Sequence, residues 1–161
     1  RSVSAFLLNR SSDLLVISWR NYSMKTDNRS LGNSFEDEFS RLLFDRGFWV
    51  KKLAQTQQGQ PADVLAVKKH KAYLIDCKVC SGDGFPLDRI EPNQTTAMEL
   101  WHDCGNGDGW FALLYGDGEI TMISFTTLKA HRDDPERKSK TLSFEEIVRD
   151  GISLERWLEK K

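Results

Sequence analysis

The sequence is short of cysteine and of long apolar segments, and both shortages narrow what the chain can be. It has only three cysteines, Cys77, Cys80 and Cys104. This odd number is too small for a disulfide framework, so we expect a reducing, cytoplasmic location. The longest apolar runs, at 14–19 and 112–115, are far shorter than the roughly 20 residues that a membrane-spanning helix needs. We therefore expect no membrane partner.

An excess of charge of one sign is also missing. The 161 residues include 23 Lys and Arg against 24 Asp and Glu, which gives a net charge of −1. This balance removes the simplest argument for a nucleic-acid partner, so any DNA-related function has to be argued from a local site. Hydrophobic residues make up 39% of the chain and charged residues 29%. These proportions are typical of a folded globular domain and exclude wholesale disorder.

Apolar spacing and turn residues divide the chain into helices and strands. A helix is expected over 34–47, with Ser34 and Asp37 as its capping box. Its apolar stripe consists of Phe35, Phe39, Leu42 and Leu43. Strands are expected over 48–53, 63–67, 72–79, 110–115 and 119–124, with a helix over 92–104 before the last two. The order α-β-β-β-α-β-β, followed by a helical tail, predicts an α/β fold with a mixed sheet flanked by helices.

The third expected strand carries charged side chains on a face that should be buried. Side chains alternate along a strand, so Leu74, Asp76 and Lys78 share one face. Burying these charges is unfavourable unless a second carboxylate, a metal or a substrate phosphate compensates them. Asp63 begins the preceding strand of the same hairpin and can supply the carboxylate. Two carboxylates this close favour a hard divalent cation such as Mg²⁺.

Two helices offer further polar groups. Glu36 and Glu38 both flank the apolar stripe of the first helix, and either could be the carboxylate that faces the site. Gln94 lies on the otherwise apolar face of the helix over 92–104, near its first turn. From there its amide could hold a water or a phosphate together with free backbone N–H groups.

Taken in order, Glu36, Asp63, Asp76 with Lys78, and Gln94 resemble the PD-(D/E)XK nuclease superfamily, whose core is also α-β-β-β-α-β. The segments 32–36, 46–48, 73–78 and 85–87 are similar to those of Holliday-junction resolvases, the RecU type in particular. The resemblance covers residues 31–130, which are expected to form the nuclease core. Residues 131–161 would form a linker and C-terminal helices. Residues 1–30 are interpreted as an N-terminal extension that is disordered or foreign to the natural chain.

The resemblance implies a metal site. Asp63 and Asp76 would bind Mg²⁺, for which Mn²⁺ could substitute, and the backbone carbonyl of Cys77 would be a further ligand. Glu36 would support the metal or its waters. No organic cofactor is implied.

The resemblance also implies roles for the remaining residues. Gln94 would position water or substrate. Lys78 would orient the attacking water and stabilise charge on the phosphate, and beside two carboxylates it is better suited to electrostatic stabilisation than to general base catalysis. Six basic residues are expected on strand edges and loops around the site, where they would contact DNA phosphates: Lys51, Lys52, Lys68, Lys69, Lys71 and Arg89.

The function implied is a Mg²⁺-dependent endonuclease that acts on Holliday junctions or other branched DNA in recombination and repair. A homodimer is expected, because a two-fold dimer supplies the two cuts that a symmetric junction needs. One alternative is a restriction-like or phage nuclease acting on duplex or single-stranded DNA. Another is a non-catalytic nucleic-acid-binding module with the same fold.

A third alternative is a zinc-binding domain that uses Cys77, Cys80, His102 and Cys104. Residues three apart on a strand point to opposite faces, however, so Cys77 and Cys80 converge only if the strand ends between them. Cys77 is better explained as a core residue.

Overall fold

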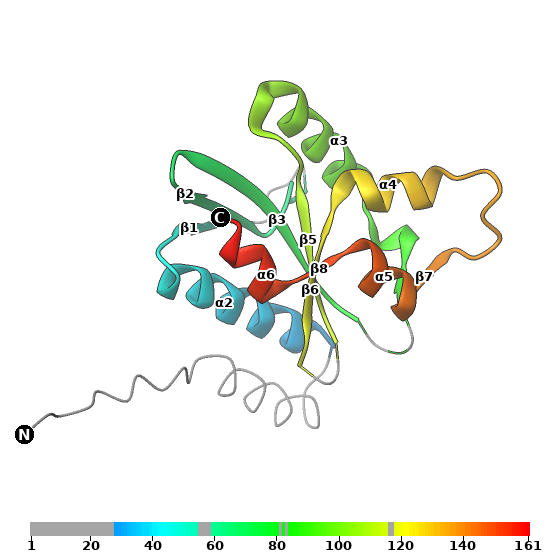
Figure 1. Cartoon of the computed structure of the whole chain (residues 1–161), viewed down its shortest axis with the longest axis horizontal. Helices are drawn as coiled ribbons and strands as arrows, with labels where there is room; N and C mark the ends of the chain where they lie inside the picture. Colours follow the sequence, from blue (N-terminus) through cyan, green and yellow to red (C-terminus); the bar gives the residue numbers. More distant parts are fainter. Residues whose placement is uncertain (1–27, 55–58, 81, 83, 116–117) are drawn as a thin grey trace, which may run out of the picture.

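The computed structural model describes residues 28–54, 59–80, 82, 84–115 and 118–161 (Figure 1). Most of the expected extension at 1–30, the greater part of the expected polar loop at 55–60 and part of the turn at 116–118 lie outside the described residues. None of the helices in the described part of the chain is long and apolar enough to cross a membrane.

The elements follow the expected order, with three short strands added. They are α2 (Asn28–Asp45), β1 (Trp49–Lys52), β2 (Val64–Lys68), β3 (Lys71–Val79), β4 (Gly84–Pro86), η1 (Leu87–Arg89), α3 (Pro92–Trp101), η2 (His102–Asn106), β5 (Trp110–Leu114), β6 (Ile120–Ser124), α4 (Phe125–Asp133), β7 (Thr141–Ser143), α5 (Phe144–Asp150), β8 (Ile152–Ser153) and α6 (Leu154–Glu159). The strands β4, β7 and β8 are too short for alternation of side chains to reveal them in the sequence.

The main sheet has the strand order β1-β2-β3-β5-β6-β8, and β4 pairs with β7 separately. Within the main sheet β3 and β5 are parallel, and the other neighbours are antiparallel. A parallel step requires a long crossover, and the segment containing α3 supplies it. The expected mixed α/β sheet is confirmed.

Each face of the sheet buries its own core. On one face α2 and α6 cover Tyr73, Ile75 and Cys77 of β3. On the other face α3, α4 and α5 cover β5 and β6, together with Leu74 of β3. The C-terminal segment belongs to the first core, since Trp157 is 1% exposed and stacks on Phe48.

The start of the first helix differs from expectation. α2 begins at Asn28, so Ser34 and Asp37 lie inside the helix and the expected capping box is wrong. Gly32 lies in this early part of the helix, where a glycine lowers the stability of the helix by about 1 kcal/mol relative to Ala. Because glycine has a low helix propensity, the residue types in this segment do not predict that the helix begins so early.

The helix expected over 92–104 ends earlier than predicted. It corresponds to α3, which stops at Trp101 and is followed by a π-type turn, η2. Gly105 ends the helical backbone with a left-handed φ of 84°, a conformation that glycine adopts without steric cost.

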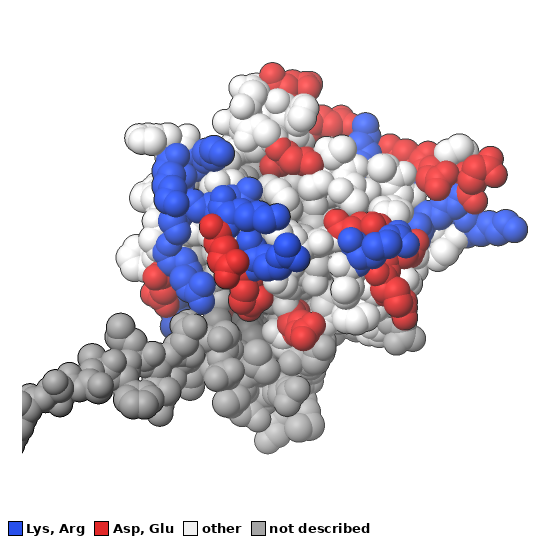
Figure 2. All heavy atoms as spheres, in the orientation of Figure 1, with Lys and Arg blue, Asp and Glu red and all other residues white. Residues whose placement is uncertain are grey.

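The surface charge is uneven despite the balanced total. On the face shown in Figure 2, Lys and Arg gather on the side of the molecule that carries β1, β2 and the C-terminal end of the chain.

Candidate active site

Asp63 is held against β3 by its own side chain. The backbone N–H of Asp63 donates to the carbonyl of Ile75 at 3.1 Å, which extends the β2–β3 ladder by one bond. Further along β3, the backbone N–H of Cys77 donates to Asp63 Oδ2 at 2.6 Å. The carboxylate thus replaces a backbone carbonyl where β2 has not yet begun. This replacement fixes Asp63, which is 7% exposed, at the edge of the site.

Asp76 is fully buried on β3. Its Oδ1 accepts a hydrogen bond of 2.7 Å from the side-chain amide of Gln94. Its Oδ2 lies 2.9 Å from Lys78 Nζ, yet among the described residues no donor meets it in hydrogen-bond geometry. Asp76 therefore has an ionic neighbour, and its Oδ2 keeps a lone pair free for a cation.

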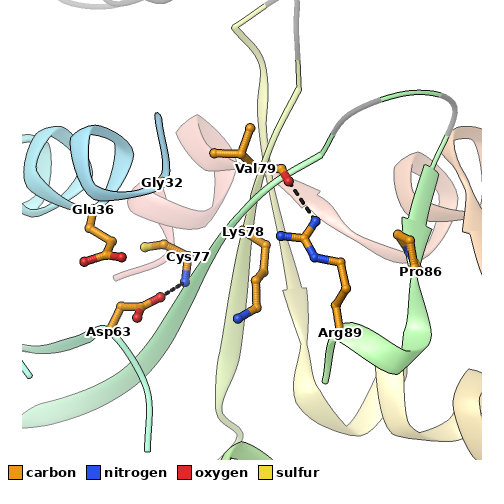
Figure 3. Close-up of a pocket in the computed structure, with 8 residues that line it drawn as sticks. All are labelled: Gly32, Glu36, Asp63, Cys77, Lys78, Val79, Pro86 and Arg89. Atoms are coloured by element: carbon orange, nitrogen blue, oxygen red, sulfur yellow. Dashed lines mark hydrogen bonds between the residues drawn. The ribbon is translucent and has the colours of Figure 1, made fainter. Parts of the chain in front are cut away.

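The pocket beside these residues has a volume of about 460 Å³. Figure 3 shows Glu36, Asp63 and Lys78 on its walls, with Cys77 between the two carboxylates and Lys78, and Arg89 on the far side. Asp76 does not line the pocket, because it lies fully buried. The pocket thus presents one carboxylate of the pair directly, with the Lys78 ammonium beside it.

Of the two helical carboxylates considered, Glu36 is the one that borders the pocket. Lys52 Nζ lies 3.3 Å from Glu36 Oε2 and 2.6 Å from the exposed carboxylate of Asp37. Glu38 instead lies 3.5 Å from Arg41 on the same helix and does not line the pocket. Glu36 therefore belongs to the rim of the site and is partly neutralised by Lys52.

Burial and mutual repulsion disfavour the charged forms of the carboxyls. Burial raises the pKa of Asp63 to about 7, the charge of Asp76 adds to the rise, and the hydrogen bond from the Cys77 amide opposes it. Burial also raises the pKa of Asp76, against the lowering effect of the Lys78 ammonium. The pKa of Glu36 is raised by burial and by Asp63, while Lys52 lowers it. The site is therefore electrostatically under-compensated and would gain from an added positive charge.

Two residues that no sequence pattern indicates support the Asp63–Asp76 pair. Gln60 Nε2 donates to Asp63 Oδ1 at 3.0 Å and to the carbonyl of Leu53 at 2.9 Å. Asn93 Nδ2 in turn donates to the carbonyl of Gln60 at 2.8 Å. Adjacent residues of the first turn of α3 thus support both carboxylates, Gln94 directly and Asn93 through Gln60.

The six basic residues expected around the site fall into two groups. Arg89 lines the pocket, and its guanidinium donates to the carbonyl of Val79 at 2.7 Å. Lys51 and Lys52 lie at the same end of the sheet, because Lys52 pairs with Val64 in the β1–β2 ladder. The other three, Lys68, Lys69 and Lys71, lie at the turn between β2 and β3.

That turn is at the opposite end of the hairpin from the site, since Val64 pairs with Ile75 near the site while Lys68 pairs with Lys71 at the turn. The expectation that these three lysines surround the site is therefore wrong. Strand alternation assigns side chains to faces but not to ends of the sheet, and the turn of this hairpin lies at the end of β2 away from Asp63.

The cysteines do not gather. Cys77 belongs to the core under α2 and Cys80 to the core on the other face of the sheet, while Cys104 is exposed. These positions give the three thiols separate environments, and burial raises the pKa of the Cys77 thiol well above its usual range.

Within the described ranges, no group of three or more His, Cys, Asp and Glu side chains is placed to hold a metal ion. The pair formed by Asp63 and Asp76 nevertheless suits Mg²⁺, which typically binds one or two carboxylates and retains several waters. The buried Asp76 Oδ2, which has no hydrogen-bond donor in the part of the chain that the structure describes, is the kind of oxygen that such an ion would satisfy.

A mixed sheet that presents an acidic pair and a lysine from its β2 and β3 strands, flanked by a glutamate from the first helix, fits the PD-(D/E)XK class of nucleases. A comparison with protein families finds a match to the archaeal Holliday junction resolvase family (Hjc) over residues 27–159. The chain belongs to this family. Members of the family are endonucleases that hydrolyse DNA, so the chain is an enzyme of this class.

Among solved structures, the fold is similar to that of Hjc, a Holliday junction resolvase from the archaeal hyperthermophile Archaeoglobus fulgidus. The TM-score is 0.59 at 14% sequence identity, and the match covers 79% of this chain and 99% of that chain. At this identity the likeness shows the fold alone. A search of curated protein sequences found no match. The comparisons do not support the closer resemblance to RecU-type resolvases.

Proposed function

We propose that the protein is a Mg²⁺-dependent endonuclease that cuts phosphodiester bonds of Holliday junctions or other branched DNA during recombination and repair inside the cell. The observation that carries the proposal is the buried Asp63–Asp76 pair, with the Lys78 ammonium 2.9 Å from Asp76 Oδ2 and lining the adjoining pocket. Membership of a resolvase family supports the choice of substrate.

Asp63 and Asp76 would hold the metal, with the backbone carbonyl of Cys77 as a further ligand and Glu36 supporting its waters. When bound, Mg²⁺ lowers the pKa of a coordinated water and polarises a phosphoryl oxygen, and Mn²⁺ can take its place. The fixed hydrogen bonds to Asp63 and Asp76 keep both carboxylates in place for this task, so little reorganisation is required.

Lys78 would act on the substrate by charge. Its ammonium lies beside Asp76 and opens onto the pocket, where it would orient the attacking water and stabilise negative charge that develops on the phosphate. Gln94 would keep Asp76 oriented through the hydrogen bond of 2.7 Å that its side-chain amide donates to Asp76 Oδ1.

DNA would approach over the basic groups at this end of the sheet. Arg89 lines the pocket, and Lys51 and Lys52 lie on β1, the strand that pairs with β2. Phosphate contacts of this kind position the duplex without reading its sequence. A homodimer would place two such sites on one junction, as paired cuts require.

A cleavage panel tests the proposal. Labelled four-way junction, flap, duplex and single-stranded DNA are incubated with Mg²⁺ or Mn²⁺ and the wild type, Asp63→Asn, Asp76→Asn or Lys78→Ala. We expect cleavage of the junction to fall at least ~100-fold in each variant, the scale of losing a charge-stabilising group, while junction binding remains. The control is Asp45→Asn, which removes an exposed acid of α2 that lines no part of the pocket.

Two outcomes contradict the proposal. Preferred cutting of plain duplex or single strands would indicate a restriction-like or phage nuclease. Binding without cutting by the wild type would indicate a non-catalytic module.

A further inference from the structure

The turn between β2 and β3 has basic residues where the backbone favours other types. Lys69 and His70 occupy its two central positions with φ values of 49° and 63°. Two-residue turns with positive φ at both positions strongly prefer Asn-Gly, because side chains crowd the backbone in this conformation. Histidine is tolerated there better than lysine. The chain therefore gives up local stability at Lys69 and retains a cation.

Only one of the lysines in this turn has a clear structural role. Lys68 Nζ donates to the carbonyl of Arg46 at 2.7 Å, just after the end of α2, and lies 4.7 Å from the centre of the Phe48 ring. Lys69, His70 and Lys71 are exposed. Within the described ranges, no carboxylate lies within ion-pair distance of Lys69 or Lys71.

A hollow of about 410 Å³ opens beside the turn. His70, Lys71 and Lys161 line it, together with residues 105–108. The Lys161 ammonium lies 5.0 Å and 5.1 Å from the ring centres of Tyr73 and Trp110. Aromatic faces attract a cation and hold it in place.

The hollow is mainly a cationic environment. Asp108 also lines it and contributes a negative charge, against the ammonium groups of Lys71 and Lys161. The Asp108 carboxylate accepts a hydrogen bond of 3.3 Å from the backbone N–H of Thr126. The described carboxylates make no ion pair with Lys161 either. In Figure 2 this side of the molecule is the one where Lys and Arg gather. Uncompensated ammonium groups around a hollow of this size suit an anionic ligand that remains partly solvated.

We propose that the β2–β3 turn and this hollow bind phosphate groups of the DNA backbone, as a second anchoring point on the same DNA that the catalytic pocket cuts. The proposal rests on the proposed function for its ligand. The turn lies five residues along β2 from Asp63, about 17 Å at the rise of a strand. That separation corresponds to roughly five base pairs along a duplex, so the anchor would hold an arm of the substrate beyond the cut.

The test compares binding and stability in one variant. Lys69→Asn combined with His70→Gly introduces the favoured turn sequence and removes one cation. Binding of a labelled four-way junction and of plain duplex is measured without divalent metal over a series of salt concentrations, and the melting temperature is measured in parallel. Lys138→Asn is the matched control, because it removes an exposed lysine from the segment between α4 and β7.

We expect the double variant to melt at a higher temperature than the wild type and to bind both DNAs about 3–10-fold more weakly, with the slope of log affinity against log salt reduced by about 1. Adding Lys71→Gln should reduce the slope by about 1 more. Free inorganic phosphate should compete only weakly, since a single anion engages fewer of these cations than a DNA backbone does.

Unchanged affinity and slope in the double variant would overturn the proposal, as would an equal loss in Lys138→Asn, which would reveal a general charge effect. A lower melting temperature in the double variant would contradict the reasoning from backbone strain. Because no metal is present, these results do not depend on cleavage, so the proposed nuclease activity can fail while DNA anchoring at the turn survives, or the reverse.

Discussion

Replacing Asp63 by asparagine should stabilise the metal-free protein while it abolishes cleavage. Asp63 is 7% exposed and next to Asp76, so its ionised form is disfavoured in the fold. Its pKa is about 7, against 3.8 for the free side chain. A shift of that size costs the folded state up to about 4 kcal/mol at a pH near 8, and a neutral side chain avoids this cost.

The gain is reduced by one mismatched hydrogen bond. Asp63 accepts from the Cys77 amide at Oδ2 and from Gln60 Nε2 at Oδ1. Asparagine has one oxygen only, so if that oxygen faces Cys77, its NH₂ group meets the NH₂ group of Gln60. Loss of that bond costs about 1–3 kcal/mol. The net gain is then about 1–3 kcal/mol, which raises the melting temperature by about 2–12 °C in a domain of this size.

The direction of the pH dependence follows from the raised pKa. The stability that protonated Asp63 contributes is complete below a pH of 3.8 and is lost as the pH rises through about 7. Asp63→Asn should therefore melt below the wild type near pH 4, where only the mismatched hydrogen bond distinguishes the two, and above it near pH 8. Scanning calorimetry over this range, without metal and with excess Mg²⁺, measures the difference.

Mg²⁺ should raise the melting temperature of the wild type and leave that of Asp63→Asn unchanged, because a ligand stabilises the state that binds it. Asp45→Asn, at a side chain that is 59% exposed, should behave as the wild type in both conditions. If Asp63→Asn melts below the wild type near pH 8 while Asp45→Asn is unchanged, the argument from a buried, repelled carboxylate is refuted.

Three further outcomes are expected. Gln60→Ala removes the donor to Asp63 Oδ1 and should weaken Mg²⁺ binding, measured by titration calorimetry, by about 10-fold or more, the usual effect of losing a group that orients a metal ligand. Hydrogen bonds from Arg137 lower the pKa of Glu146 to about 2. The ionised side chain therefore contributes stability above pH 4.5, and this contribution is lost as the pH falls towards 2. The urea midpoint of Glu146→Gln should accordingly fall less on acidification than that of the wild type. Trp157→Ala, at a residue 1% exposed, should cost about 3–5 kcal/mol in urea unfolding, whereas Trp49→Ala, at a residue 59% exposed, should cost less than about 0.5 kcal/mol.

The sequence was most informative where periodicity and burial agree. The alternation along 72–79 identified which residues of β3 share a face, and the structure indeed separates Leu74 from Tyr73 and Ile75 into different cores. The same alternation showed that Asp76 is buried with a charge and needs compensation. The proximity of Asp63 then followed from the hairpin, because antiparallel neighbours bring the start of one strand beside the end of the other.

Other features depend on contacts that no local pattern encodes. Gln60 lies in a polar segment before β2, and nothing in its spacing indicates that its amide reaches Asp63 and Leu53. Its partner Asn93 is 33 residues away in the sequence. The early start of α2 is not predicted for a different reason. Gly32 weakens the local preference for helix, whereas the helix itself is stabilised by the packing of Phe35 and Phe39 in the core.

The first turn of α3 explains how a sheet can keep two buried carboxylates at fixed positions despite their repulsion. Gln94 is both the donor to Asp76 and half of the capping box with Glu91 that starts the helix. Asn93 reaches Gln60, which holds Asp63. The helix start and the acidic pair therefore stabilise one another, and a change that disrupts the cap should loosen both carboxylates together. The structure thus couples the stability of α3 to the geometry of the proposed metal site.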